Sequence, residues 1–369
     1  MNEDFVMYVK TPQEFLDGIQ LSQNAFLKST KIIINNRKNS FSQPQQLLND
    51  ARNGVSALMN HYGGQFPHAQ LSSYSLHMSS DLFGKSACID IWANYMGTGK
   101  ELNDFTCIAA EIGELLNRKI QTTCHAIDKL KVFDSWVKEF FCYENNNELT
   151  DHSAICLLKN RTGVCQAIAA LAVKVLPYMG IRTIYVTGQG KGMNGWGPHA
   201  WNAVYIDHRW IHVDFTFSLN SLWLPSTRTK YGAYMFSKSH QWSEIEYSQK
   251  AMSAKYEMFR KNISGTITIS YETGTFSFNH VRIASGSTML MEEYQGKRWV
   301  NLFCLLRFIG GSCEWLPEQD TLYICLYDRR RIVKNASKKM RNGLFDVGIL
   351  RTIGTLRTEG ENTLELTLD

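Results

Sequence analysis

Cys165 stands after Gly163-Val164 and at the start of an alanine-rich stretch, residues 165–176, that predicts a helix. A cysteine at a helix N-terminus lies among backbone N–H groups that have no intrahelical partner, and at the positive end of the helix dipole. Both favour the thiolate, which is the nucleophilic form of cysteine, and the same N–H groups can bind a developing oxyanion. The position suits attack on a carbonyl carbon, although most cysteines only pack in a core.

A β-hairpin is predicted downstream, with strands at residues 199–206 and 209–215. Its two-residue loop, Asp207-His208, pairs Ile206 with Arg209 and thereby sets the register of the two strands. A loop of two or four residues keeps the same side chains on each face, whereas a three-residue loop would reverse them on one strand.

This register places Trp201 opposite Asp214, with His199 one diagonal step away on the same face. A carboxylate next to a histidine can hold the imidazole in one tautomer while the other ring nitrogen faces a thiol. We therefore expect Cys165, His199 and Asp214 to form one catalytic group.

The elements that must position these residues predict an α+β fold. They are a helix from Pro12 to about Gln20, strands at 31–35, 74–78 and 87–92, a helix at 45–62, helices within 103–143 that break near Thr122-Thr123, the helix at 165–176 closed by Pro177 and Gly180, a strand at 182–187, the hairpin, and a helix at 243–260. We expect an N-terminal α+β extension (1–98), a core that carries Cys165 (99–225), a connector (226–264) and a C-terminal α+β or mostly β accessory domain (265–369).

The stretches GVCQAIAALAVKVLPYMGIRTIYVTG and GPHAWNAVYIDHRWIHVDFTF resemble the core of the transglutaminase-like superfamily. In that superfamily the Cys, His and Asp motifs follow in this order on a helix start and two successive strands, in a papain-like architecture. The resemblance covers about residues 100–220 and includes Asp151-His152. It implies that Cys165 is the nucleophile, His199 the general base and acid, and Asp214 the residue that orients His199, with a thioester acyl-enzyme as intermediate.

The superfamily includes proteases, amidases, crosslinking transglutaminases and inactive relatives, so the fold does not decide the reaction. We expect a cysteine-dependent amide hydrolase, a protease or peptidase with a protein or peptide substrate, because nothing in the sequence reveals the protected amine channel that a transferase needs. The alternatives are a protein-glutamine transglutaminase or deamidase and, in a different class, a catalytically inactive binding or scaffold protein.

Three further residues are candidates for the oxyanion site or the substrate cleft. The N–H group of Cys165 or Gln166 could bind the oxyanion. Tyr143 stands where many relatives have an aromatic residue ahead of Asp151-His152, but it could equally pack in the core. Trp201, on the site face of the hairpin, could wall the cleft or belong to the core.

Composition excludes some classes of protein. The chain has 369 residues, 44% of them hydrophobic and 20% charged, which indicates a folded protein of more than one domain. The net charge of +5 is too mild for a dedicated nucleic-acid binder, and no apolar run reaches the roughly 18 residues that cross a bilayer. Without a recognisable signal peptide we expect a cytoplasmic protein, or an extracellular one if such a segment had been removed.

Metal and disulfide signals are weak. The nine cysteines form no CxxC pair, which favours reduced thiols. The histidines other than His199 show no metal-ligand spacing, so we expect no metal and no cofactor. Gly190 to Gly195 matches GxGxxG, but a strand and not a helix follows, so we expect a flexible loop that borders His199 and not a phosphate site.

The C-terminal stretch GKRWVNLFCLLRFIGGSCEWLPEQDTLYICLYD resembles one repeat unit of copper-amine-oxidase N-terminal-like domains, over about residues 275–330. Asn301 stands where such modules often have proline, and the resemblance implies a binding or stalk module without a copper site. A nearby basic cluster could contact an anionic surface or polymer, or form a solvated flank: Arg329, Arg330, Arg331, Lys334, Lys338, Lys339 and Arg341. Few aromatic residues interleave with it, so nucleic acid is not expected.

Overall fold

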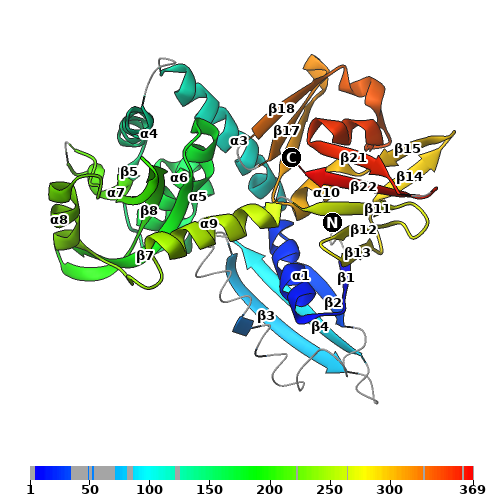
Figure 1. The fold of residues 1–369 in the computed structure, drawn as a ribbon, viewed down its shortest axis with the longest axis horizontal. Helices are drawn as coiled ribbons and strands as arrows, with labels where there is room; N and C mark the ends of the chain where they lie inside the picture. The colour runs from blue at the N-terminus through cyan, green and yellow to red at the C-terminus, as the bar shows by residue number, and fades with distance from the viewer. Residues whose placement is uncertain are drawn as a thin grey trace.

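The computed structural model describes residues 5–34, 49, 52–53, 71–80, 86–120, 125–221, 223–263, 265–326, 329–359 and 361–368. The fold is α+β, as predicted, with helices and several separate sheets (Figure 1). The helix predicted at 45–62 and the break predicted near Thr122-Thr123 lie largely outside the described residues.

The N-terminal segment begins with a strand and a capped helix. Thr11 Oγ1 accepts the backbone N–H of Glu14 at 3.2 Å, and Pro12 occupies the first helical turn, so the predicted helix start is confirmed. The described elements of this segment are β1 (Phe5–Val9), α1 (Pro12–Asn24), β2 (Ser29–Ile34), β3 (Leu71–Ser80) and β4 (Ala87–Tyr95).

The core segment carries the predicted site residues on helices and a four-stranded sheet with the order β10-β7-β8-β9. Its helices are α3 (Gly99–Arg118), α4 (Ala126–Phe140), η3 (Leu149–His152), α5 (Ala154–Asn160), α6 (Cys165–Val175), η4 (Leu176–Met179), α7 (Phe215–Ser218), α8 (Lys230–Ser239) and α9 (Gln249–Ile263). Its strands are β5 (Cys142–Tyr143), β6 (Thr162–Gly163), β7 (Thr183–Gly192), β8 (Gly195–Ile206), β9 (Arg209–Val213) and β10 (His240–Gln241).

The C-terminal segment is mostly β, with three short 3₁₀ turns and one α-helix. Its elements are β11 (Thr266–Ser270), β12 (Thr275–Phe278), β13 (Val281–Ser285), β14 (Met291–Tyr294), β15 (Lys297–Val300), α10 (Leu302–Phe308), β16 (Ser312–Leu316), η5 (Pro317–Gln319), β17 (Thr321–Leu326), β18 (Arg329–Lys334), η6 (Ala336–Lys339), β19 (Met340–Arg341), β20 (Leu344–Asp346), η7 (Val347–Thr352), β21 (Gly354–Thr358) and β22 (Thr363–Leu368).

The two ends of the chain share one nine-stranded sheet, ordered β21-β22-β11-β12-β13-β1-β2-β4-β3. β1 pairs parallel with β2 and antiparallel with β13, so that Met7 faces Ile283 across the ladder. One hydrophobic core includes residues of both segments, from Phe5 to Leu368. The expectation of two separate units at 1–98 and 265–369 therefore needs correction, because sequence periodicity shows where strands lie but not which strands pair.

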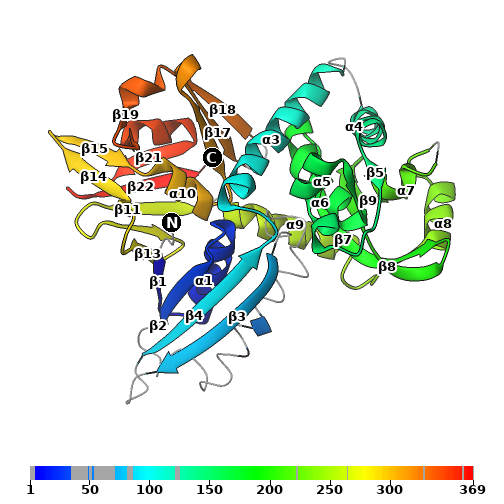
Figure 2. The same cartoon turned by 180° about the vertical axis from the view of Figure 1, so that it is seen from behind.

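Helix α3 joins the core segment to the C-terminal sheets, and both views place it between α6 and β17–β18 (Figures 1 and 2). Cys107 Sγ lies 3.1 Å from Ser312 Oγ in this buried contact. Arg330 of β18 reaches back to the same helix, with N···O distances of 2.6 Å to Glu111 and 3.1 Å to Glu114. Arg330, one of the seven cations in the basic cluster, thus contacts the chain itself. No described helix is long and apolar enough to cross a membrane.

The Arg330 contacts predict a measurable contribution to stability. Its side chain is 8% exposed, and its guanidinium lies 4.1 Å from the ring of Tyr323. Because the two glutamates are partly exposed, Arg330→Ala should lower the free energy of unfolding by about 1–3 kcal/mol, measured by urea denaturation. Arg331→Ala, at an exposed neighbour, should change it by less than about 0.5 kcal/mol. Equal effects of the two variants would contradict a specific role for Arg330.

Candidate active site

Cys165 is the first residue of α6, as predicted, and its side chain is half-buried. Val164 is the N-cap residue, and its N–H donates to the carbonyl of Asp151 at 3.0 Å. The Asp151 carboxylate in turn accepts the N–H of Asn146 at 2.7 Å. These bonds hold the chain immediately before the cysteine, and helix α6 holds it immediately after. The backbone at Cys165 is therefore fixed on both sides.

The hairpin register is confirmed. Ile206 pairs with Arg209, and Asp207 and His208 both have positive φ, 51° and 60°, as a tight two-residue turn requires. Asn202 pairs with Val213, so the next position along places Trp201 level with Asp214, which follows the last residue of β9.

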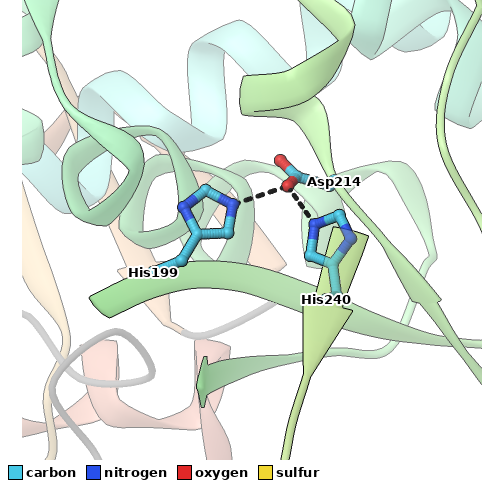
Figure 3. Close-up of side chains that lie close together, drawn as sticks. All are labelled: His199, Asp214 and His240. Atoms are coloured by element: carbon cyan, nitrogen blue, oxygen red, sulfur yellow. Dashed lines mark hydrogen bonds and ion pairs between the residues drawn. The ribbon is translucent and has the colours of Figure 1, made fainter. Parts of the chain in front are cut away.

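His199 links the cysteine to the carboxylate. Its Nε2 lies 2.7 Å from Oδ2 of Asp214 (Figure 3), and the Cys165 thiol lies close enough to interact with the ring and raise its pKa. Because an imidazole has two nitrogens on opposite sides, the nitrogen that does not bind Asp214 is the one that faces the thiol. The three residues expected to act together are therefore brought together.

Asp214 is fully buried, and four donors surround its carboxylate. Oδ1 accepts the backbone N–H groups of Thr216 at 2.7 Å and Phe217 at 3.0 Å, so Asp214 caps α7. Oδ2 accepts Nε2–H of His199 and of His240, each at 2.7 Å. Burial by itself would raise the pKa of Asp214, but the two imidazole donors outweigh it and hold the pKa well below its ordinary range.

The electrostatics of His199 follow from the same bonds. Burial of its ring lowers the pKa, but the hydrogen bonds with Asp214 and Cys165 outweigh that effect and raise the pKa to about 10. At neutral pH the ring is therefore an imidazolium beside the Cys165 sulfur, an arrangement that stabilises the thiolate.

His240 is the residue that sequence reasoning missed. It forms β10, is buried, and comes from the connector, 26 residues beyond Asp214 in the chain. It approaches Asp214 from the side opposite His199 (Figure 3). No motif or spacing in the sequence points to it, because its place depends on the pairing of β10 with β7.

His199, Asp214 and His240 also bring three possible metal-binding atoms within 4.8 Å of one another. An ionised carboxylate only accepts hydrogen bonds, so both Nε2 atoms carry hydrogen in this arrangement. A divalent ion would have to displace both hydrogens. The contacts described are those of a hydrogen-bonded group, and the expectation of no metal stays a prediction.

The structure separates the three supporting candidates. Gln166 is the second residue of α6, where its N–H is free of intrahelical bonding, and its side-chain oxygen lies 3.0 Å from Nδ1 of His152. Tyr143 is half-exposed. Burial raises the pKa of its hydroxyl, and so do the nearby charges of Cys165 and Asp214, which indicates that Tyr143 lies close to the site.

Trp201 does not wall an open cleft, because its side chain is only 1% exposed. It lies beneath the site, with its ring stacked 5.7 Å from that of His199 and its Nε1–H donating to Nδ1 of His212 at 2.9 Å. Alternation along β8 could show that Trp201 shares a face with His199, but not that α8 and β10 would cover it.

The glycine-rich stretch is a hairpin and not the expected flexible loop, although it does border His199. Gly190 and Gly192 belong to β7, and Gly195 begins β8. A Cβ on Gly190 would lie 2.7 Å from Cγ of His199, whereas a Cβ on Gly192 would meet nothing within 4 Å. The missing side chain of Gly190 is what allows the imidazole to lie against β7.

These residues define a cysteine–histidine–aspartate site on an α+β fold, with the cysteine at a helix start, the histidine on β8 and the aspartate directly after β9. Residues 114–215 match the family model of the transglutaminase-like superfamily, and the match contains all three. This segment is therefore similar to the transglutaminase-like core. No curated protein matches the chain, and the resemblance of the C-terminal segment to amine-oxidase modules stays a prediction.

Three solved structures are similar to parts of the chain. A TGase is 16% identical, with a TM-score of 0.28, and the match covers 51% of each chain. A candidate cysteine protease from Cytophaga hutchinsonii is 15% identical, with a TM-score of 0.27, over 59% of this chain and 80% of the other. A candidate protease from Parabacteroides distasonis ATCC 8503 is 10% identical, with a TM-score of 0.23, over 50% and 40% of the two chains.

The contact between Gly190 and His199 predicts a matched pair of variants. Gly190→Ala should push the imidazole away from Cys165 and slow alkylation of that thiol by iodoacetamide at pH 7 by about tenfold or more, because the thiolate loses its cation. Gly192→Ala, on the same strand, should leave the rate unchanged. Circular dichroism checks that both variants fold, and equal alkylation rates in them would contradict the placement of His199.

Proposed function

We propose that the protein is a cysteine-dependent amide hydrolase, a protease or peptidase that acts through a thioester acyl-enzyme. The observation that carries the proposal is the hydrogen bond from His199 to the buried carboxylate of Asp214, on a ring whose pKa the nearby Cys165 thiol also raises. A histidine held only for packing needs no thiol on one nitrogen and an ionised carboxylate on the other.

In the acylation step the Cys165 thiolate attacks the carbonyl carbon of an amide. The carbonyl π electrons move to oxygen, and the N–H group of Cys165 or Gln166 at the start of α6 stabilises that oxyanion. The tetrahedral intermediate then collapses, the C–N bond breaks, and the His199 imidazolium gives its proton to the leaving amine. The products are a thioester on Cys165 and a free amine.

In the deacylation step water attacks the thioester carbon while His199, now neutral, takes one proton from the water. Collapse of the second intermediate breaks the C–S bond and releases a carboxylic acid, which restores the thiolate and imidazolium. The balance is one amide and one water giving one acid and one amine. Asp214 stays ionised throughout and keeps the Nε2–H bond of His199 in place.

The identity of the second nucleophile separates hydrolysis from transfer. Incubation with casein and a fluorescent primary amine should produce new peptide N-termini without amine incorporation, and Cys165→Ala should abolish cleavage while Cys142→Ala, at an exposed cysteine, retains it. Cysteine-dependent incorporation of the amine would favour a transglutaminase instead, ammonia release alone a deamidase, and the absence of any acyl-enzyme a scaffold protein.

The imidazolium predicts a selective thiol. Iodoacetamide at pH 7 should label Cys165 before Cys142, although Cys142 is the more exposed, because the His199 imidazolium lies next to the Cys165 sulfur. His199→Asn should slow labelling of Cys165 by about tenfold or more and leave Cys142 unchanged, as measured by mass spectrometry of peptides. Labelling that follows exposure alone would contradict the proposed nucleophile.

The raised pKa of His199 sets the alkaline limit of turnover. Activity should fall as pH rises through about 10, and not near 6.5, because above that pH the ring has no proton for the leaving amine. The same bonds contribute stability that is complete below pH 6.5 and is lost as pH rises through about 10, so circular dichroism must show folded protein at each pH. A decline centred near pH 7 in folded protein would contradict the prediction.

A further inference from the structure

His240 is more than a buried ring in the core of the site. Its Nε2 lies 2.7 Å from the same carboxylate oxygen, Oδ2 of Asp214, that His199 binds. With the hydrogen on Nε2, Nδ1 accepts the hydroxyl of Ser239 at 2.9 Å, so both ring nitrogens have partners. The ring stacks on Phe236 with centroids 3.8 Å apart, which fixes its plane.

The Asp214 carboxylate does not need His240 to keep its position. Its other oxygen is held by the backbone N–H groups of Thr216 and Phe217, and these bonds set the rotation of the carboxylate. What His240 adds is a second N–H on Oδ2, in a place that water does not reach because Asp214 and His240 are both buried. Two donors on one oxygen compete for its electron density, so each is held less tightly than it would be alone.

We propose that His240 is a positioning residue whose Nε2–H limits how strongly Asp214 holds the His199 imidazolium, so that His199 can release its proton to the leaving amine. This role rests on the proposed function. If His199 were the only imidazole on the buried Asp214 carboxylate, the carboxylate would stabilise its charged form more strongly. A general acid that holds its proton too tightly transfers it slowly.

Among the described residues, few other titratable groups lie near His240. The titratable side chains that face His240 are Asp214, His199 and His212. The other aromatic rings against it are those of Trp201, Phe217 and Phe236. Burial, and then the nearby His240, lower the pKa of His212 to about 3, so His212 is a neutral acceptor for the Trp201 indole. His240 lies beyond the residues matched by the family model, which end at 215.

The test compares His240→Phe, which keeps the ring stacked on Phe236 but removes the donor, with His240→Gln, which keeps an N–H near the same place. Histidine-selective ¹⁵N NMR follows the titration of His199, assigned by its loss in His199→Asn, and needs no substrate. His240→Phe should raise the pH at which His199 titrates by about one unit, because a hydrogen bond to a charged group typically changes a pKa by about that much. It should also lower kcat about tenfold and leave KM unchanged. His240→Gln should restore most of both.

An unchanged or lowered His199 titration in His240→Phe would overturn the proposal, and so would an equal shift in His240→Gln. If His240→Phe does not fold, Ser239→Ala supplies the test: losing the hydroxyl at Nδ1 weakens Nε2–H as a donor, so a smaller upward shift supports the proposal and no shift contradicts it. A shifted titration in protein that never turns over a substrate would support the effect of His240 on the His199 imidazolium while the proposed function failed.

Discussion

A single buried carboxylate sets the requirements for the rest of the site. An ionised Asp214 without exposure to water is tolerated only if its lone pairs all find donors, because the cost of burying an unpaired charge exceeds what packing returns. Two of the donors come from the first turn of α7, one from β8 and one from β10. The hairpin, the short helix after it and the connector therefore have to meet at one point, which is also where the cysteine helix begins.

The parts of this arrangement that could be predicted are those decided locally. A helix start places Cys165 among free N–H groups whatever surrounds it. The two-residue turn at Asp207-His208 fixes which residues of the two strands share a face of the sheet, and this register alone puts His199 and Asp214 on one face. Neither inference needs knowledge of distant contacts, which is why the structure agrees with both.

The parts that could not be predicted depend on pairing between distant segments. His240 reaches the site because β10 adds to the edge of β7, where Gly188 leaves room for the backbone of Gln241. Trp201 is covered by elements that follow it in the chain, so its burial has no local sign. The pairing of β1 with β13 likewise leaves no trace in the periodicity of either strand. Alternation of apolar residues identifies a strand, but it does not show which other strand forms hydrogen bonds with its edge.

The sheet built from both ends of the chain has a consequence for how the molecule is made. As synthesis proceeds, β1 emerges long before β13, and everything between them, including the cysteine helix and the hairpin, is complete by the time β13 appears. Loop-closure entropy delays such distant pairings relative to local ones. The thiol site can thus assemble on the ribosome while the edge of β1 is still unpaired, so the nascent chain is exposed to chaperones and to aggregation at its N-terminal strands until β13 emerges.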